Sequence, residues 1–502
     1  MTETDLVAIS PLIFVIALAM LIIVADIFWP DRDDISTGLT VAGLLVGAGL
    51  TVLVAQSEAR EIFAGAYVVD PLTSFLDVLF LAIALVTVLV APDYLRPRGL
   101  PMAEFTATLL FAISGAMLIS GSRDLLVLFL GLELLVLPGY MLAGYAKRDG
   151  YSTEGAIKYF LLGSFSSAIF LFGLALTWGF TGTTRIREVA ASLAQLDTAS
   201  ALAPALLMGL ALLTTGVAFK IAAVPFHYWT PDAYQGSPTP VTGYLSVGPK
   251  VAAFALILRL FVEALAPIKA DWTPVVIVLA AITMTLGNLV ALTQDNVKRM
   301  LAYSSIAHTG YIMVGLAAYA GAPVGSEAER AGLEGLLFYS VAYAFMNLGA
   351  FAIVSALQHR RGVTSQIETF AGLGRRAPWA AILMTLFLLS LTGIPPTAGF
   401  FAKAYVVLAA VQAGGWVSVL AVIAVLNAAA AAFYYLRVVV FMFMRDPPET
   451  ARPVLTGTMM RAGLAITAVM TIFIGLVPPV TSGVIEFARV AAEVLLVRTA
   501  GG

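Results

Sequence analysis

Apolar runs recur along the whole chain, and short polar or charged stretches separate most of them. A helix needs about 20 apolar residues to cross the hydrocarbon of a bilayer. The pattern therefore predicts an all-α integral membrane protein with about 14 transmembrane helices. The expected spans are 7–29, 36–56, 72–94, 103–121, 125–146, 155–180, 203–226, 240–265, 273–293, 300–320, 334–357, 378–411, 416–443 and 460–482.

An internal repeat links the two halves of this pattern. The stretch Pro138-Gly-Tyr-Met-Leu-Ala-Gly144 is similar to Thr309-Gly-Tyr-Ile-Met-Val-Gly315, at an offset of 171 residues. The same offset pairs Asp124 with Asp295, and Pro225 with Pro396. Because five spans separate the partners, they would cross the membrane in opposite directions. We interpret this as an inverted five-helix repeat, spans 4–8 and 9–13, which is common among ion-coupled transporters.

The repeat divides the chain into four expected parts. Residues 1–100 hold the first three spans, 101–266 the first repeat, 267–445 the second repeat, and 446–502 the last span with a short amphipathic tail. Lysine and arginine are more frequent in the odd-numbered loops than in the even-numbered loops and the termini. The positive-inside rule then predicts that the odd loops are cytoplasmic and that both termini are periplasmic.

Composition supports a membrane protein and excludes several kinds of chemistry. Of all residues 60% are hydrophobic and 12% charged, whereas soluble domains are about 25% charged. The chain has no cysteine, which excludes disulfides and thiolate-bound iron–sulfur clusters within it. Its histidines, His227, His308 and His359, lie far apart without metal-binding spacing. The sequence therefore predicts neither a bound cofactor nor a metal in this chain.

Among the charged residues inside apolar runs, four stand out: Glu133, Lys220, Lys250 and Lys403. A charge at the bilayer centre costs about 2.5–3.5 kcal/mol on insertion scales, so each needs a reason to be there. Loss of hydration disfavours the charged form of a lysine, and a nearby carboxylate favours it. Movement of Glu133 relative to Lys220 would therefore load or unload a proton. We interpret the four as a proton relay; the alternative is a set of structural ion pairs.

Prolines accompany the three lysines. They are Pro225, Pro249, Pro395 and Pro396. A proline inside a helix removes a backbone donor and opens the helix, and the freed carbonyls must be satisfied by protein or water. We therefore expect breaks beside the lysines, in particular broken seventh and twelfth helices, with hydration at each break.

Four further residues are weaker candidates for a secondary proton path: Lys158, His227, Tyr303 and His308. Histidine exchanges protons near neutral pH, although a buried histidine can equally be a packing residue. Lys158 lies near a span end and could reach the interface instead. Sodium would favour carboxylate and carbonyl ligands, and lysines repel cations, so protons are the favoured cargo.

The stretch from Pro225 to Lys250 resembles the hallmark of the antiporter-like membrane subunits of respiratory complex I. It ends in Leu-Ser-Val-Gly-Pro-Lys, a form similar to the subunit N branch. The L and M branches and the multi-subunit sodium/proton antiporters usually read His-Ala here. Lys403 argues against the M branch, where glutamate is typical, and the short tail after the last span argues against the L branch, which carries a long lateral helix.

The resemblance implies a role for individual residues and for the whole chain. The family's proton-path residues match Glu133, Lys220, Lys250 and Lys403, and its members also suggest roles for Lys158, His227 and Tyr303. What the resemblance implies is a proton-pumping subunit in a bacterial inner membrane, driven by NADH:quinone electron transfer elsewhere. FMN, iron–sulfur clusters and quinone would bind partner subunits, and the neighbours would be the M, K, J and A subunits and lipids. The alternatives are a subunit of a cation/proton antiporter or membrane hydrogenase, and a scaffold that pumps nothing.

Overall fold

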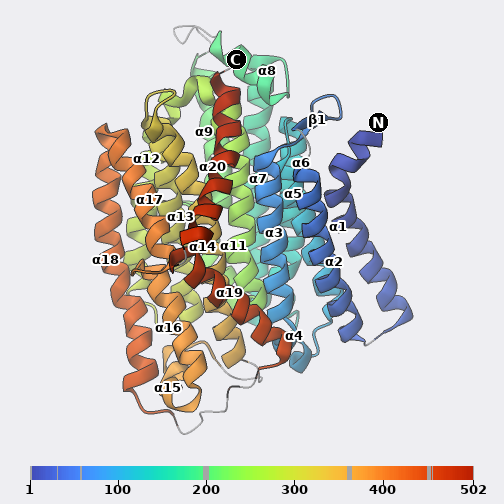
Figure 1. Ribbon diagram of the computed structural model, residues 1–502, viewed down its shortest axis with the longest axis vertical. Helices are drawn as coiled ribbons and strands as arrows, with labels where there is room; N and C mark the ends of the chain where they lie inside the picture. The colour runs from blue at the N-terminus through green and yellow to red at the C-terminus, as the bar shows by residue number, and fades with distance from the viewer. Residues whose placement is uncertain are drawn as a thin grey trace.

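The computed structural model describes residues 3–30, 32–56, 59–195, 203–358, 364–448, 454, 456–476 and 478–500. Long helices lie side by side in one bundle, and both labelled ends of the chain are at the same end of it (Figure 1). The short elements α4 (Pro92–Leu95) and α15 (Leu373–Arg376) mark the opposite end. His359 lies outside the described residues.

Eleven described helices are long and apolar enough to cross a membrane. They are built on α1 (Glu3–Phe28), α2 (Asp33–Ala55), α3 (Pro71–Val90), α5 (Met102–Ser120), α6 (Leu125–Ala143), α7 (Gly150–Thr181), α11 (Thr239–Ile257), α12 (Lys269–Ala291), α14 (Glu327–Leu357), α18 (Gly415–Met444) and α19 (Thr458–Leu476).

The remaining expected spans are also helical. They are α13 (Val297–Gly321) and three shorter apolar helices, α9 (Ala203–Lys220), α16 (Pro378–Thr392) and α17 (Ala398–Ala413). Minor elements complete the described chain: the hairpin β1 (Arg60–Ile62) and β2 (Tyr67–Val69), η1 (Arg96–Arg98), α8 (Ile186–Ala194), α10 (Trp229–Gly236), η2 (Leu258–Ala264), η3 (Ala266–Ile268), η4 (Ile367–Phe370) and α20 (Pro478–Ala500). The all-α membrane architecture expected from the sequence is confirmed.

Two spans are interrupted midway. Helix α9 ends at Lys220, and the next helix, α10, starts only at Trp229, with Pro225 between them. Helix α16 ends at Thr392 and α17 starts at Ala398, so that Pro396 lies in the gap. Because proline cannot supply a helical N–H, it lies in the connection in both cases.

The break expected at Pro249 is wrong. Helix α11 runs without interruption from Thr239 to Ile257, with Pro249 inside it. Pro249 cannot donate to the carbonyl of Leu245 four residues earlier, but the hydroxyl of Tyr234 does so instead, at 2.8 Å. A side chain from α10 thus replaces the missing backbone hydrogen bond, and the helix continues into the π-helical turn η2.

The tail expected after the last span is longer than the sequence pattern indicated. Helix α19 ends at Leu476, and α20 follows as a helix of 23 residues that packs against α3 and α14. Figure 1 shows α19 crossing the bundle obliquely and α20 rising toward the C-terminal end. The face that α20 turns to the bundle is fully buried and includes Ala488, Ala491, Ala492 and Leu495.

The junction between α19 and α20 lies on the break between α16 and α17. Any Cβ at Gly475 would collide with the backbone of Pro396, Thr397 and Ala398. Glycine is therefore required there, because two backbones approach each other more closely than a methyl group allows.

Helices α6 and α13 begin in the same way. Asp124 caps α6 and Asn296 caps α13, each through its side chain. Each also forms an isolated antiparallel bridge to a later connection, Asp124 with Arg185 and Asn296 with Gln366. The inverted repeat itself stays a prediction, but its two expected halves share this local construction.

A buried network of charges joins η2 to the end of the bundle that carries the hairpin. Arg259 donates to Asp70 at 3.1 Å, to Glu263 at 2.7 Å and to the carbonyl of Ser120 at 2.8 Å. Glu263 also pairs with Arg123. The side chains of Arg259 and Asp70 are fully buried, so these charges are stabilised by one another and by the hydrogen bonds of Ser120 and Thr73.

Replacement of Arg259 is expected to destabilise the protein strongly. In Arg259→Ala, the carboxylates of Asp70 and Glu263 would remain buried after losing the cation that pairs with both. Such a loss costs on the order of 3–5 kcal/mol. The thermal stability of the purified complex, and the amount of assembled complex in membranes, would measure the loss. Arg32→Ala is the control, because its pair with Asp34 is about 60% exposed on both sides; equal stability of the two variants would contradict the prediction.

The topology predicted from the charge bias can be tested with reporters. Alkaline phosphatase fused after residue 502 is expected to be active, because it folds only in the periplasm. The same enzyme inserted after Lys147 is expected to be inactive, while a fluorescent protein there is expected to fluoresce. The reverse result would place the termini in the cytoplasm.

Candidate functional site

Lys220 is the last residue of α9 and is buried against α7. Its ammonium donates to the hydroxyl of Ser167 at 2.9 Å and approaches the carbonyl of Gly163 at 3.5 Å. A cation is favoured at the C-terminal end of a helix, where unpaired carbonyls point outward. The break that follows thus places Lys220 where the backbone itself stabilises a charge.

The polar groups exposed by this break have partners from three helices. Trp229 donates to the carbonyl of Phe219, and the N–H of Val224 donates to Thr283 on α12. Thr309 on α13 donates to the carbonyl of Ile221 at 2.8 Å. Thr309 therefore connects the end of α9 to the helix that faces the next lysine.

Lys250 lies deep inside α11 and has only neutral partners. Its ammonium donates to the carbonyl and hydroxyl of Ser305, both at 2.6 Å, and to the hydroxyl of Thr309 at 3.0 Å. The residue is 2% exposed, and no carboxylate of the described residues pairs with it. Thr309 thus lies between Lys250 and the end of α9, which brings Lys220 and Lys250 into one polar region.

His308 continues this polar region from Lys250 toward Lys403. Tyr343 donates to the hydroxyl of Ser305 at 2.7 Å, and its ring stacks on His308 with centroids 5.0 Å apart. The charges of both Lys250 and Lys403 act on His308. Sequence reasoning gave His308 a packing role at least as readily as a proton role, whereas the structure places it between Lys250 and Lys403.

Lys403 lies on α17 and caps the half-helix before it. Its ammonium donates to the carbonyls of Leu391 at 2.9 Å and Thr392 at 2.8 Å, at the end of α16. It also lies 4.6 Å from the centre of the Tyr311 ring, a favourable cation–π distance. Tyr311 in turn lies beside His308, with ring centroids 5.7 Å apart.

Glu133 lies on α6, which packs against α7, the helix on which Lys220 is buried. Its charge acts on Lys220, but within the described residues the two form no ion pair, and one buried carboxylate oxygen of Glu133 has no hydrogen-bond partner. Glu133 is therefore near Lys220 without being bound to it.

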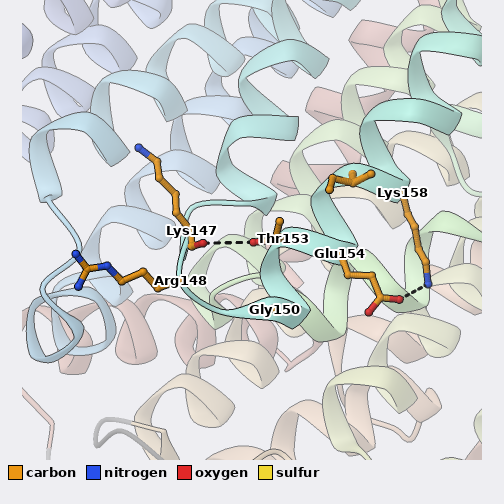
Figure 2. Close-up of a pocket in the computed structure, with 7 residues that line it drawn as sticks. Lys147, Arg148, Gly150, Thr153, Glu154 and Lys158 are labelled. Atoms are coloured by element: carbon orange, nitrogen blue, oxygen red, sulfur yellow. Dashed lines mark hydrogen bonds and ion pairs between the residues drawn. The ribbon is translucent and has the colours of Figure 1, made fainter.

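Lys158 belongs to a separate cluster of charges near the start of α7. It pairs with Glu154 at 2.6 Å and with Asp232 at 2.7 Å, and Asp232 also pairs with Arg299. Figure 2 shows the ammonium of Lys158 beside the Glu154 carboxylate at the edge of an open pocket. Its side chain is 42% exposed, so the structure does not bring Lys158 together with the buried lysines.

His227 and Tyr303 are also apart from the central polar region. His227 lies in the break after α9, where it stacks on Tyr228, and its buried Nδ1 has no partner among the described residues. The ring of Tyr303 lies 5.9 Å from the guanidinium of Arg299. Tyr303 therefore belongs with the Asp232 cluster and not with His308.

Sequence reasoning missed the hydroxyl groups that hold the lysines. Ser305, Thr309 and Tyr343 carry no charge, and serine and threonine are common in apolar helices, so nothing marked them. Lys298 was counted as a loop cation, yet it is 3% exposed and donates to the carbonyl of Ser237 at 2.6 Å. Arg259 carried a usable signal, since it is a charge inside the expected span 240–265.

Comparison with known proteins identifies the family. Residues 122–427 match the transmembrane family described as NADH:quinone oxidoreductase/Mrp antiporter. The chain is 44% identical to NADH-quinone oxidoreductase subunit N 2 of Roseiflexus castenholzii, over 92% of this chain and 91% of the relative. It belongs to the subunit N family of NADH-quinone oxidoreductase. Subunit N of Trichlorobacter lovleyi is 39% identical over 98% of both chains.

Solved structures agree with this assignment. A chain of respiratory complex I from Thermus thermophilus with bound aureothin superposes with a TM-score of 0.76 and 32% identity, over 94% of this chain and 98% of that one. A chain of the Mrp complex from Dietzia superposes with a TM-score of 0.82 at 22% identity, over 99% of this chain and 98% of that one. The second likeness shows a shared fold. The chain is thus an antiporter-like membrane subunit of a respiratory translocase, as the sequence indicated.

Removal of the Tyr234 hydroxyl is expected to destabilise α11 beside Lys250. In Tyr234→Phe the carbonyl of Leu245 would lose its donor, and an unsatisfied buried carbonyl costs about 1–3 kcal/mol. The thermal denaturation midpoint of the purified complex would measure this effect. Tyr151→Phe is the control, because Tyr151 is 70% exposed. An unchanged midpoint in Tyr234→Phe would show that the carbonyl of Leu245 has another partner.

Proposed function

We propose that the chain moves protons through a relay of Lys220, Lys250, His308 and Lys403, with Glu133 controlling the charge on Lys220. The observation that carries the proposal is the row of polar groups from Ser167 to Lys403, buried inside a membrane bundle, in which hydrogen bonds and ring contacts alternate with gaps. Thr309, Ser305 and Tyr343 join its members, and both Lys250 and Lys403 act on His308.

The relay works through repulsion between its members. Three of its groups are lysines and one is a histidine, so protonation of one disfavours protonation of its neighbours. A proton that arrives at Lys250 therefore promotes release from His308 or from Lys403. Lysine suits this role because, unlike arginine, it gives up its proton when desolvated. Enclosed water completes the steps between groups that do not touch.

Glu133 provides the point at which an outside event can enter the relay. A carboxylate near Lys220 stabilises the ammonium, and its withdrawal favours proton release. The free carboxylate oxygen of Glu133 fits a group that exchanges partners. We infer that electron transfer in other subunits moves this pair apart or together.

The relatives named subunit N give the context of the proposal. The chain would work as a subunit of bacterial complex I in the inner membrane, next to the M subunit and the small K, J and A subunits. FMN, iron–sulfur clusters and quinone would be bound by other subunits. The side of the membrane that each terminus faces follows from the charge bias alone.

Substitution of Lys250 tests the relay. In membranes that contain the assembled complex, Lys250→Ala is expected to lower NADH-driven proton uptake roughly tenfold, which corresponds to ~1.4 kcal/mol added to the barrier of the limiting step. Lys250→Arg is expected to be equally impaired, because arginine keeps its proton. A pH-sensitive dye in inside-out vesicles would measure uptake, with the amount of complex as the reference.

The control for these variants is Lys147→Ala, which removes a lysine that is exposed and not buried. A scaffold would respond differently from a relay: it would need only the positive charge and its hydrogen bonds, so Lys250→Arg would pump normally. Normal uptake by Lys250→Ala in an assembled complex would overturn the relay altogether.

A further inference from the structure

A cleft of about 950 Å³ opens at the end of the bundle that carries α4 and α15. The charge bias of the loops predicts this end to be cytoplasmic. The cleft reaches inward to Ser237, Lys298 and Gln358, where α10, α13 and α14 end or begin. It therefore brings solvent to the near end of α11, the helix that carries Lys250.

Lys298 lies at the floor of this cleft. Its ammonium donates to the carbonyl of Ser237 at 2.6 Å, and a lysine ammonium has three donors. The charged groups that act on it are Asp149 and Arg98, one of each sign. Lys298 is thus a buried cation with a neutral partner, in contact with a cleft that water can fill.

A column of polar side chains leads from this floor toward Lys250, between α11 and α14. At the floor, Thr239 donates to the side-chain oxygen of Gln358. At the other end, Asn347 donates to the hydroxyl of Ser246 at 2.6 Å. Ser305, which holds Lys250, approaches the carbonyl of Ser246 at 3.5 Å. The column therefore extends from Gln358 at the floor of the cleft to Ser246, next to the Ser305 that binds Lys250.

The residues of α14 in this column share one face of the helix. Asn347, Ser355 and Gln358 are separated by eight and three residues, which corresponds to about two turns and one turn. This face lies directly on α11, where a Cβ at Gly243 would be 3.3 Å from Phe351. Asn347 and Gln358 are about 16 Å apart along the axis at 1.5 Å per residue, so the column covers the distance from the cleft to the level of Ser246.

Two polar atoms inside the column have no partner among the described residues. They are Oδ1 of Asn347 and Oγ of Ser355, and both residues are fully buried. A buried polar atom without a partner costs about 1–3 kcal/mol, and such atoms in folded proteins are generally satisfied by ordered water. Their positions mark where water would lie between the floor of the cleft and Lys250.

We propose that protons reach Lys250 from the cleft along this column, with Lys298 exchanging protons at the floor and with Ser355 and Asn347 positioning the water that carries them. In each step one O–H or N–H bond breaks as the next one forms, and Lys250 accepts the proton at the end. This inference rests on the relay proposed above, to which it adds a route of supply separate from Glu133 and Lys220.

A matched pair of substitutions at Ser355 tests the route. Valine and threonine have almost the same shape, so Ser355→Val and Ser355→Thr differ mainly in the hydroxyl group. NADH-driven proton uptake would be measured in inside-out vesicles, whose outer face is the cytoplasmic one, between pH 6 and pH 8. We expect the rate of proton uptake in Ser355→Val to be roughly tenfold below the wild-type rate at pH 8. The rate is expected to approach the wild-type value toward pH 6, because a higher proton concentration compensates for a slower route.

Ser355→Thr is expected to follow the wild-type profile. The packing control is Ser340→Val on the same helix, since Ser340 is equally buried and donates to the carbonyl of Leu336 in its own helix. A merely structural role for Ser355 would lower uptake by the same factor at every pH and would impair Ser340→Val similarly.

Asn347→Leu and Asn347→Ser provide a second pair if Ser355→Val does not assemble. We expect Asn347→Leu to follow the Ser355→Val profile, and Asn347→Ser, which keeps an uncharged polar group, to follow the wild-type profile. Lys250→Ala, measured in parallel, separates the two proposals. If it abolishes uptake while Ser355→Val and Asn347→Leu keep the wild-type pH profile, the supply route is overturned and the relay stands. If Lys250→Ala pumps normally, both are overturned.

Discussion

Hydrocarbon offers no hydrogen bond to a backbone group or a charge, so each one inside this bundle must find its partner in the protein or in enclosed water. The prolines make this requirement severe, because each leaves a carbonyl without its helical donor. At Pro249 the requirement is met by Tyr234, which keeps α11 continuous. At the end of α16 it is met by Lys403, which donates to two open carbonyls. The lysine that would carry a proton is thus also the group that completes the broken helix.

That double role connects the chemistry of Lys403 to its structure. When the ammonium loses its proton, it also loses part of its attraction for the carbonyls of Leu391 and Thr392. The end of α16 would then depend more on water. Lys220 lies in a comparable position at the end of α9, whereas Lys250 lies inside an unbroken helix and binds hydroxyl groups of α13. The ammonium of Lys403 is therefore coupled to a backbone end, whereas those of Lys220 and Lys250 are held by groups inside the neighbouring helices α7 and α13.

The sequence predicted the membrane fold and the charged members of the site, because both depend on a strong local signal. A charge within twenty apolar residues is conspicuous, and so is a proline. What the sequence could not indicate was the partner of each group. Tyr234 repairs α11 from another helix, and Ser305 holds Lys250 from 55 positions away. The difference between Lys158 and Lys220 was equally hidden, since only the packing of the helices leaves Lys158 partly exposed and buries Lys220. The expected tail was too short because α20 gains its stability from contact with α3 and α14.

Gly475 gives the C-terminal helices a mechanical role. Because the backbone at Gly475 lies directly on Pro396, Thr397 and Ala398, the gap between α16 and α17 has no free space on that side. A displacement of this gap would push on the end of α19, and the following helix, α20, contacts α3, α14 and η2. The strain would then be felt at Arg259 and Glu263, at the far end of the helix that carries Lys250. The last two helices thus connect the break beside Lys403 to the buried charges of η2, and the connection begins at a glycine.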